Sequence, residues 1–401
     1  MAYYAYKSQT NNRNRRPSGG SGSRSRGNRR PGAKYIDPTR FVKAAKPVTA
    51  ETEYVPTHKF DDFDVHQVVK TNLRAKGFVT PTPIQDQTII PALAGKDIIG
   101  IANTGTGKTA AFAIPILHML MSQRGSRALV VAPTRELAMQ IEEDIRSMAK
   151  GSGLFGAVLI GGAPIGRQLR DLRSNPQIVI GTPGRIKDHI ERRTLNLERF
   201  NMVVLDEVDR MLDMGFVDDV REILSNVAAQ RQSFFFSATL DARVNSLIQT
   251  FSNEPVTISI KTGETSDNVD QNVIQFGGNM EKIEKLHDVL IQPNVTKAII
   301  FDETQRSVER LSNELIDRGF AAVSIHGGKN QGQRQRALAS FKANQTTILV
   351  ATDVAARGID VADVSHVINY TQPQSYEDYV HRIGRAGRAG KTGYALTFVN
   401  R

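Results

Sequence analysis

The 401-residue chain contains no cysteine. It can therefore form neither disulfides nor thiolate metal sites, which suits a reducing compartment such as the cytoplasm. No apolar run reaches the roughly 18 residues that a membrane-spanning helix needs. The N-terminus, MAYYAYKSQT, lacks the apolar core of a secretory signal. We therefore expect a cytoplasmic protein without a membrane segment.

Acidic residues are nearly absent from the first 50 residues, which hold twelve Lys and Arg against one acid, Asp37. This excess of +11 equals the net charge of the whole chain, so the remaining residues are balanced. The segment SGGSGSRSRGNRRPG cannot bury enough apolar area to offset the entropy of ordering. We predict a disordered basic tail over residues 1–55. It either binds a phosphate backbone without sequence preference or serves as a solubilising leader.

From about residue 58 onward, short apolar runs alternate with helical stretches, a rhythm typical of parallel α/β sheets. The runs are almost continuously apolar, as strands buried on both faces should be. In the first half of the chain they cover residues 97–102, 128–133, 157–162, 177–182, 202–207 and 233–238. In the second half they cover residues 297–303, 321–327, 347–353 and 365–371.

A polar stretch without hydrophobic periodicity, residues 261–271 (KTGETSDNVDQ), separates the two halves. We interpret it as a linker. The predicted domains are residues 58–262 and 271–401, with residues 263–270 between them. Because ligands of open α/β sheets bind at the carboxyl ends of the strands, the loops at those ends are the first candidates for a site.

One of these loops has the composition of a phosphate-binding loop. The run 97–102 leads into NTGTGKT (103–109) and then into a helical stretch. Glycines let backbone N–H groups surround phosphate oxygens, Lys108 can reach the terminal phosphates, and the Thr109 hydroxyl can bind Mg²⁺. The general motif begins with glycine where this chain has Ala102. The flanking strand and helix nevertheless favour a nucleotide site over a solvated turn.

Acidic residues follow the buried run that begins at residue 202. Asp206 can hold the Mg²⁺ shell and Glu207 can polarise an attacking water. An acidic helix cap would give a similar local sequence, but the phosphate loop upstream favours the catalytic interpretation.

These motifs, together with others that follow in the order typical of the family, make residues 60–401 similar to the DEAD-box ATP-dependent RNA helicases. The resemblance is narrower still to their bacterial RhlE-like members. The resemblance implies two RecA-like domains, each a mostly parallel sheet flanked by helices. It also implies binding of ATP and Mg²⁺ and hydrolysis of ATP to ADP and phosphate. Residues 102–109 match the family's A-x-x-G-x-G-K-T, which accounts for Ala102. Residues 206–209 read DEVD, with Val208 where the family has alanine; all three acids remain.

The resemblance implies that an upstream aromatic residue and a T-P-I-Q element bind adenine, and that residues of both domains contact ATP. These residues are Phe60, Phe78, Thr82, Gln85, Ala102, Asn103, Thr104, Gly105, Thr106, Gly107, Lys108, Thr109, Gly358 and Asp360.

RNA contacts are implied for strand-end loops of both domains, where hydroxyls, helix starts and Arg side chains bind phosphates without sequence readout. They are Pro133, Thr134, Arg135, Gly162, Thr182, Gly184, Arg185, Thr304, Gln331, Arg334, Thr352 and Arg357. A smaller set would couple hydrolysis to strand separation: Asp209, Ser237, Thr239 and His381.

The motif HRIGRAGR occupies residues 381–388. On a helix, Arg385 and Arg388 would project from one face because they are three residues apart. By resemblance they are arginine fingers for the γ-phosphate, which completes a catalytic set with Lys108, Asp206 and Glu207. Ala386 stands where the family has threonine, without loss of charge.

The sequence therefore predicts an ATPase at the cleft between two domains, which drives local RNA unwinding or remodelling of ribonucleoproteins. An ATP-gated RNA clamp and a DNA-directed translocase are the alternatives. The clamp could use the same catalytic residues, whereas the Gln85 element argues against the translocase. We expect a monomer that binds RNA through its backbone, with ribonucleoprotein, RNA-degradation or ribosome-assembly proteins as candidate partners. The RNA target cannot be predicted.

Overall fold

The computed structural model of the chain describes residues 36–45, 54–103, 105–260, 268–356, 361, 363–387 and 392–401. Most of the predicted tail, namely residues 1–35 and 46–53, lies outside the described residues, as do residues 261–267 of the predicted linker. The same holds for five predicted site residues: Thr104, Arg357, Gly358, Asp360 and Arg388. None of the described helices combines the length and apolar character needed to cross a membrane.

The first domain is built on a seven-stranded parallel sheet with the strand order β3-β4-β2-β5-β6-β1-β7. Its strands are β1 (Ile98–Ile101), β2 (Ala128–Val131), β3 (Gly156–Leu159), β4 (Ile178–Gly181), β5 (Met202–Leu205), β6 (Gln232–Ser237) and β7 (Val256–Ser259). The first six overlap the apolar runs of the first half, which confirms the predicted parallel α/β architecture.

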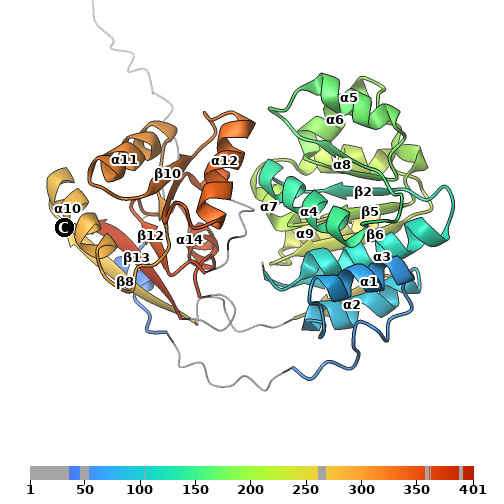
Figure 1. Cartoon of the computed structure of the whole chain (residues 1–401), viewed down its shortest axis with the longest axis horizontal. Helices are drawn as coiled ribbons and strands as arrows, with labels where there is room; N and C mark the ends of the chain where they lie inside the picture. The colour runs from blue at the N-terminus through green and yellow to red at the C-terminus, as the bar shows by residue number, and fades with distance from the viewer. Residues whose placement is uncertain are drawn as a thin grey trace, which may run out of the picture. The chain divides into compact units, whose positions relative to one another are not determined.

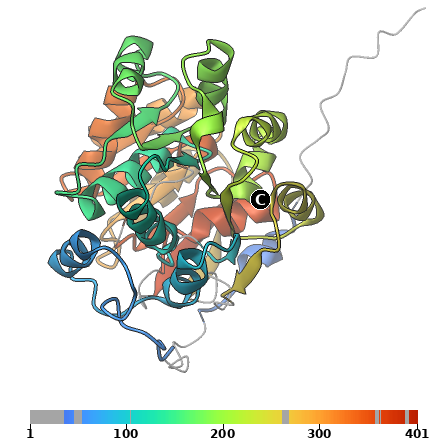
Figure 2. The same ribbon diagram turned by 90° about the vertical axis from the view of Figure 1, so that its right-hand side faces the viewer.

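Helices cover both faces of this sheet. On one face are α1 (Gln67–Ala75), α2 (Pro83–Leu93), α3 (Lys108–Ser122) and α4 (Arg135–Met148). The other elements are α5 (Ile165–Arg173), α6 (Pro183–Glu191), η2 (Leu197–Arg199), α7 (Val208–Asp213), α8 (Val217–Asn226) and α9 (Ala242–Phe251). Of these, α6 to α9 contribute to the core on the opposite face. Figures 1 and 2 show α1, α2 and α3 grouped together.

Successive residues of the central strands enter different cores. Val130 and Val204 belong to one buried cluster, whereas Leu129 and Val203 belong to the other. Because both faces must be apolar, the strands read as continuous hydrophobic runs rather than as alternating ones. The burial therefore explains why these strands were detectable in the sequence.

The second domain contains a six-stranded parallel sheet with the order β10-β11-β9-β12-β13-β8. The strands are β8 (Val269–Phe276), β9 (Ala298–Phe301), β10 (Ala322–Ile325), β11 (Ile348–Ala351), β12 (His366–Asn369) and β13 (Gly393–Asn400). Its helices are η1 (Pro38–Phe41), α10 (Asn279–Leu290), α11 (Gln305–Asp317), α12 (Gln331–Lys342), α13 (Asp353–Ala356) and α14 (Tyr376–Ile383).

Two features of the second domain correct the sequence analysis. Strand β8 includes Val269 and Asp270, which had been assigned to the linker. This strand lies at the sheet edge and pairs only with β13 among the described strands, so it can be polar and gives a weak hydrophobic signal. Residues 36–45, which had been assigned to the disordered tail, pack on this domain because Ile36 and Phe41 are apolar and become buried.

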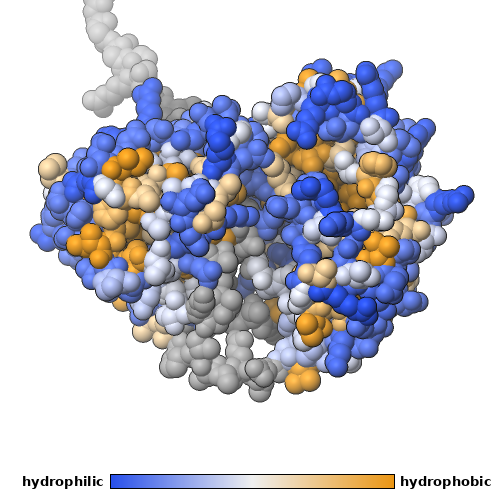
Figure 3. All heavy atoms as spheres, in the orientation of Figure 1, coloured by the Kyte–Doolittle hydropathy of each residue, from blue (hydrophilic) through white to orange (hydrophobic). Residues whose placement is uncertain are grey.

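The outer surface visible in Figure 3 is predominantly hydrophilic, with apolar residues in small scattered groups. Scattered apolar residues of this kind are normal for soluble domains.

Candidate functional site

The phosphate-loop residues connect β1 to α3, as the sequence predicted. Gly105 and Gly107 adopt left-handed backbone conformations, with φ of 81° and 92°, which glycine adopts without steric cost. Lys108 is the first residue of α3 and is 7% exposed. Its Nζ donates a hydrogen bond of 2.9 Å to the carbonyl oxygen of Ala102. The ammonium group is therefore held at the mouth of the loop.

Thr82 and Gln85, at the start of α2, brace this loop. The Thr82 hydroxyl donates to the carbonyl of Thr106 at 2.8 Å, and the Gln85 amide nitrogen donates to the carbonyl of Gly107 at 3.1 Å. The amide oxygen of Gln85 accepts the Thr82 N–H at 2.9 Å. The oxygen and the nitrogen of the Gln85 amide thus both contact protein. The nitrogen has a second hydrogen and the oxygen a second lone pair that could bind a ligand, so contact with adenine stays a prediction.

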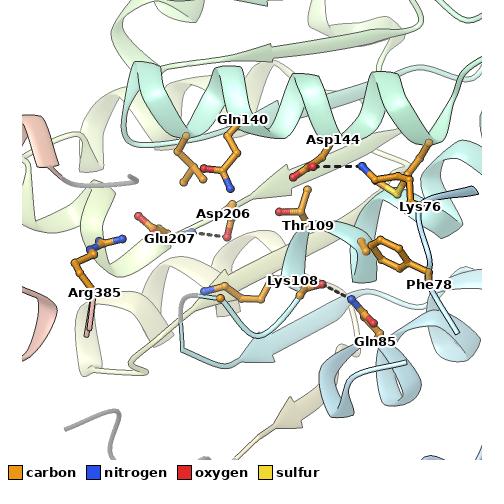
Figure 4. A pocket seen from close by; sticks show the side chains of 15 residues that line it. Lys76, Phe78, Gln85, Lys108, Thr109, Gln140, Asp144, Asp206, Glu207 and Arg385 are labelled. Carbon is orange, nitrogen blue, oxygen red and sulfur yellow. Dashed lines mark hydrogen bonds and ion pairs between the residues drawn. The ribbon is translucent and has the colours of Figure 1, made fainter. Parts of the chain in front are cut away.

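The two predicted adenine-side aromatic residues occupy different places. Phe78 lines the cavity in front of the phosphate loop, together with Gln85 (Figure 4). Phe60 is 4% exposed, belongs to the domain core and is not among the residues that line this cavity. Its ring centroid lies 5.5 Å from that of Phe78, edge to face. Phe60 therefore supports the ring that lines the cavity.

The acidic cluster lies at the carboxyl end of β5, facing the phosphate loop. Asp206 is 3% exposed, and burial raises its pKa to about 6, while the Lys108 ammonium acts in the opposite direction. Glu207 has φ of 54° and ψ of 55°, a left-handed conformation that is costly for a residue with a side chain. Its Oε2 has no hydrogen-bond partner and lies 3.6 Å from Nε of Arg210.

The side-chain oxygen atoms in this cavity are suited to a hard divalent cation such as Mg²⁺. The described residues contain no cluster of three or more His, Cys, Asp or Glu that could hold a metal alone. Mg²⁺, however, binds through one or two carboxylates together with waters and substrate phosphates. Asp206 and Thr109 line the same cavity and supply oxygen atoms, and the buried Oε2 of Glu207 lacks a hydrogen-bond partner beside them.

Arg385 comes from the second domain and lines the same cavity as Lys108, Asp206 and Glu207 (Figure 4). It is 5% exposed. The prediction that Arg385 lies on helix α14 is wrong, and Arg388 lies outside the described residues. Helix α14 ends at Ile383 with Gly384 as its cap, so Arg385 lies in the following turn. Glycine is a poor helix former and a frequent helix terminator, which explains this early end.

Asp209 joins the acidic cluster to the Ser237–Thr239 loop. Its Oδ2 accepts the backbone N–H groups of Ala238 and Thr239 at 3.0 and 2.9 Å, and the Thr239 hydroxyl at 3.1 Å. The N–H of Asp209 donates to the Ser237 hydroxyl at 3.3 Å. His381 lines a second cavity beside Asp209 and Thr239. The predicted coupling residues therefore lie together. Burial lowers the pKa of His381 to about 4, and Arg210 acts in the same direction.

The predicted RNA loops of the first domain lie at the carboxyl ends of β2, β3 and β4. Thr134 caps α4 by accepting the N–H of Leu137 at 3.2 Å, and Thr182 precedes α6. The Arg135 guanidinium packs against Gly162, where a Cβ would meet it. Arg185 donates to the carbonyl of Ala163 at 3.4 Å. Of the remaining members, Pro133 lies in the loop after β2, and Gly184 is the second residue of α6.

In the second domain, Thr304 caps α11, and Gln331 begins α12. Thr352 follows β11 and is 9% exposed. Arg334 forms an ion pair of 2.8 Å with Glu136, and both side chains are buried. The Arg334 guanidinium is thus engaged by protein, and RNA contacts by these four residues stay predictions.

Several residues that line the cavity were not predicted from the sequence, among them two polar residues of α4. Gln140 and Asp144 on α4 line the cavity with Leu137 and Met148 (Figure 4). Asp144 also pairs with Lys76 at 3.7 Å. The spacing of these four α4 residues, three, four and four, places them on one helix face. That spacing was the available signal, although it does not say what the face contacts.

Comparisons with known proteins agree with this geometry. Residues 82–247 match the family model described as DEAD/DEAH box helicase, and residues 281–390 match the helicase conserved C-terminal domain. The chain is 45% identical over 345 residues to the DEAD-box ATP-dependent RNA helicase CshA of Bacillus subtilis, covering 86% of this chain and 70% of that protein.

Solved structures are similar as well. A DEAD box protein from Methanococcus jannaschii is 39% identical with a TM-score of 0.51, and the match covers 86% of this chain and 93% of that one. Dbp5 of S. cerevisiae, bound to RNA and ADP BeF3, is 28% identical with a TM-score of 0.74, covering 85% and 89%. The narrower resemblance to RhlE-like members stays a prediction.

Proposed function

Since the chain belongs to the DEAD-box ATP-dependent RNA helicases, we propose that it hydrolyses ATP in the cavity lined by Lys108, Asp206, Glu207 and Arg385 and uses this reaction to separate short RNA duplexes. The observation that carries the proposal is the presence of these four side chains around one cavity. One domain supplies the first three and the other supplies the arginine. Hydrolysis would therefore depend on both domains.

Each side chain has a role that its environment supports. Lys108 would exchange its bond to the Ala102 carbonyl for phosphate oxygens. Thr109 and Asp206 would hold Mg²⁺, which would neutralise phosphate charge and orient the transferred group. Glu207 would orient the attacking water, since its Oε2 has no hydrogen bond within the protein. Arg385, with Arg388, would stabilise charge in the transition state.

Coupling to RNA would run through Asp209. Its carboxylate holds the Ser237–Thr239 loop, and Asp209 lies only two positions after Glu207 in the chain. The loops with Thr134, Arg135 and Thr182 would grip the phosphate backbone, because hydroxyls, helix starts and guanidinium groups bind phosphates without reading bases. RNA binding is therefore expected to be sequence-tolerant and salt-dependent.

The test is RNA-stimulated ATPase activity measured beside displacement of a short RNA duplex. Glu207→Gln keeps the size of the side chain but removes the charge, and it should lower the RNA-stimulated kcat by at least a hundredfold, a loss in the range for general-base catalysis. Glu191→Gln, an exposed position on α6, is the matched control and should leave both activities unchanged.

The proposal fails if Glu207→Gln retains the activity of Glu191→Gln. ATPase activity without displacement would instead indicate a clamp. Equal stimulation by DNA of the same length, at the same salt concentration, would contradict RNA selectivity.

A further inference from the structure

The segment before the first domain is anchored on the second domain. Asp37 caps the short helix η1 by accepting the N–H of Thr39 at 2.9 Å. Phe41, at the end of η1, is fully buried. Lys43 then forms two backbone hydrogen bonds with Gln271 of the edge strand β8, of 3.0 and 2.8 Å. We call residues 36–43 the clasp.

The clasp packs against α14, the helix that leads to Arg385. The ring centroid of Phe41 lies 4.7 Å from that of Tyr379, and the Arg40 guanidinium lies 4.0 Å above the ring of Tyr376. Tyr376 and Tyr379 are three residues apart and share one helix face. The Tyr379 hydroxyl donates to the Gln271 amide at 3.0 Å. The clasp and β8 therefore hold the same tyrosine.

A second set of contacts, made by the polar side chain of Arg382, also holds α14 in place. Arg382 forms two bonds of 2.6 Å with Asp353 and also donates to the carbonyl of Thr371 at 2.7 Å. The helix is thus restrained by Asp353 through Arg382 and by the Phe41 ring through Tyr379. Arg385 lies two residues beyond its end, so a shift of α14 would move Arg385 relative to the cavity.

The other end of the same segment is fixed to the first domain. The buried carboxylate of Asp86 accepts the Tyr54 hydroxyl at 2.6 Å, the Thr57 N–H at 2.7 Å, and a 2.7 Å contact from Nδ1 of His58. Asp86 follows Gln85, which braces the phosphate loop. Eight residues, 46–53, connect this anchor to residue 45 at the end of the described clasp segment.

We propose that Arg40 and Phe41 are positioning residues for ATP hydrolysis, because they hold α14 in the place from which Arg385 reaches the cavity. This inference rests on the proposed function. Losing the Phe41 ring would leave a void beside Tyr379 and allow α14 to shift. A displacement of about 1 Å at a reacting group can lower a rate by a hundredfold.

The experiment compares Phe41→Ala with Val42→Ala in the full chain. Val42 is the next residue and is 53% exposed, so its variant is a matched control. Phe41→Ala should lower the RNA-stimulated kcat by about tenfold to a hundredfold with the KM for ATP changed less than twofold. Phe41→Leu, which refills most of the void, should recover most of the rate.

A second measurement does not depend on activity. Amide hydrogen exchange in residues 376–383 should become faster in Phe41→Ala and stay unchanged in Val42→Ala. Equal kcat values and equal exchange in the two variants would overturn the proposal. A lower melting temperature with unchanged kcat would also overturn it, since the clasp would then be structural only. A wild-type chain without RNA-stimulated ATPase would refute the proposed function instead, while the exchange data would still report on the clasp.

Discussion

Replacing Asp209 with asparagine tests how the acidic cluster communicates with the Ser237–Thr239 loop. The carboxylate accepts three hydrogen bonds on Oδ2 and the Arg210 N–H on Oδ1. An amide has only one oxygen, so in either orientation its NH₂ group faces a backbone N–H donor. The best orientation loses the bond to Arg210 and converts the others from charged to neutral.

The magnitude follows from these bonds. Loss of one charge-assisted bond costs roughly 1.5–3 kcal/mol, and neutralising the rest adds to it, so we expect about 3 kcal/mol. For a domain of this size that corresponds to a fall in melting temperature of roughly 6–12 °C. Because the restraint on the loop is weakened while Lys108 and Glu207 remain, we expect fewer duplexes displaced per ATP hydrolysed.

The assay is thermal unfolding together with the ratio of duplex displacement to ATP hydrolysis. Asp213→Asn provides the control, because Asp213 is on the same helix but is 43% exposed and pairs with Arg243 at the surface. Surface pairs contribute less than about 1 kcal/mol. If the two variants have the same melting temperature and the same ratio of duplex displacement to ATP hydrolysis, the inferred coupling through Asp209 is refuted.

Two further predictions concern the phosphate loop and pH. Gln85→Glu keeps an oxygen for the Thr82 N–H but turns a second oxygen toward the Gly107 carbonyl, which repels it. The KM for ATP should therefore rise by roughly tenfold, equivalent to about 1.4 kcal/mol. An unchanged KM would contradict a role of Gln85 in holding the phosphate loop. Burial lowers the pKa of His366 to about 4, so the unfolded chain binds a proton that the folded chain does not. Stability should therefore fall as the pH drops from about 6.5 toward 4, and His366→Asn should flatten this part of a urea-unfolding profile.

The sequence by itself determined the parallel sheets and the order of the motifs. Strands such as β2 and β5 are buried on both faces, and continuous apolar runs record this directly. The phosphate loop was equally readable, because Gly105, Gly107 and Lys108 must follow one another in the chain to surround a phosphate. Local patterns of this kind depend only on neighbouring residues.

Tertiary structure alone decided which distant residues support that chemistry. The bond from Gln85 to Gly107, the cavity face of Gln140 and Asp144, and the packing of Phe41 on Tyr379 each join separate segments of the chain. Periodicity shows which side of an element is apolar but not what will cover it. A basic and glycine-rich beginning therefore suggested disorder throughout, whereas two apolar side chains, Ile36 and Phe41, were enough to bury the end of that segment against a neighbouring helix.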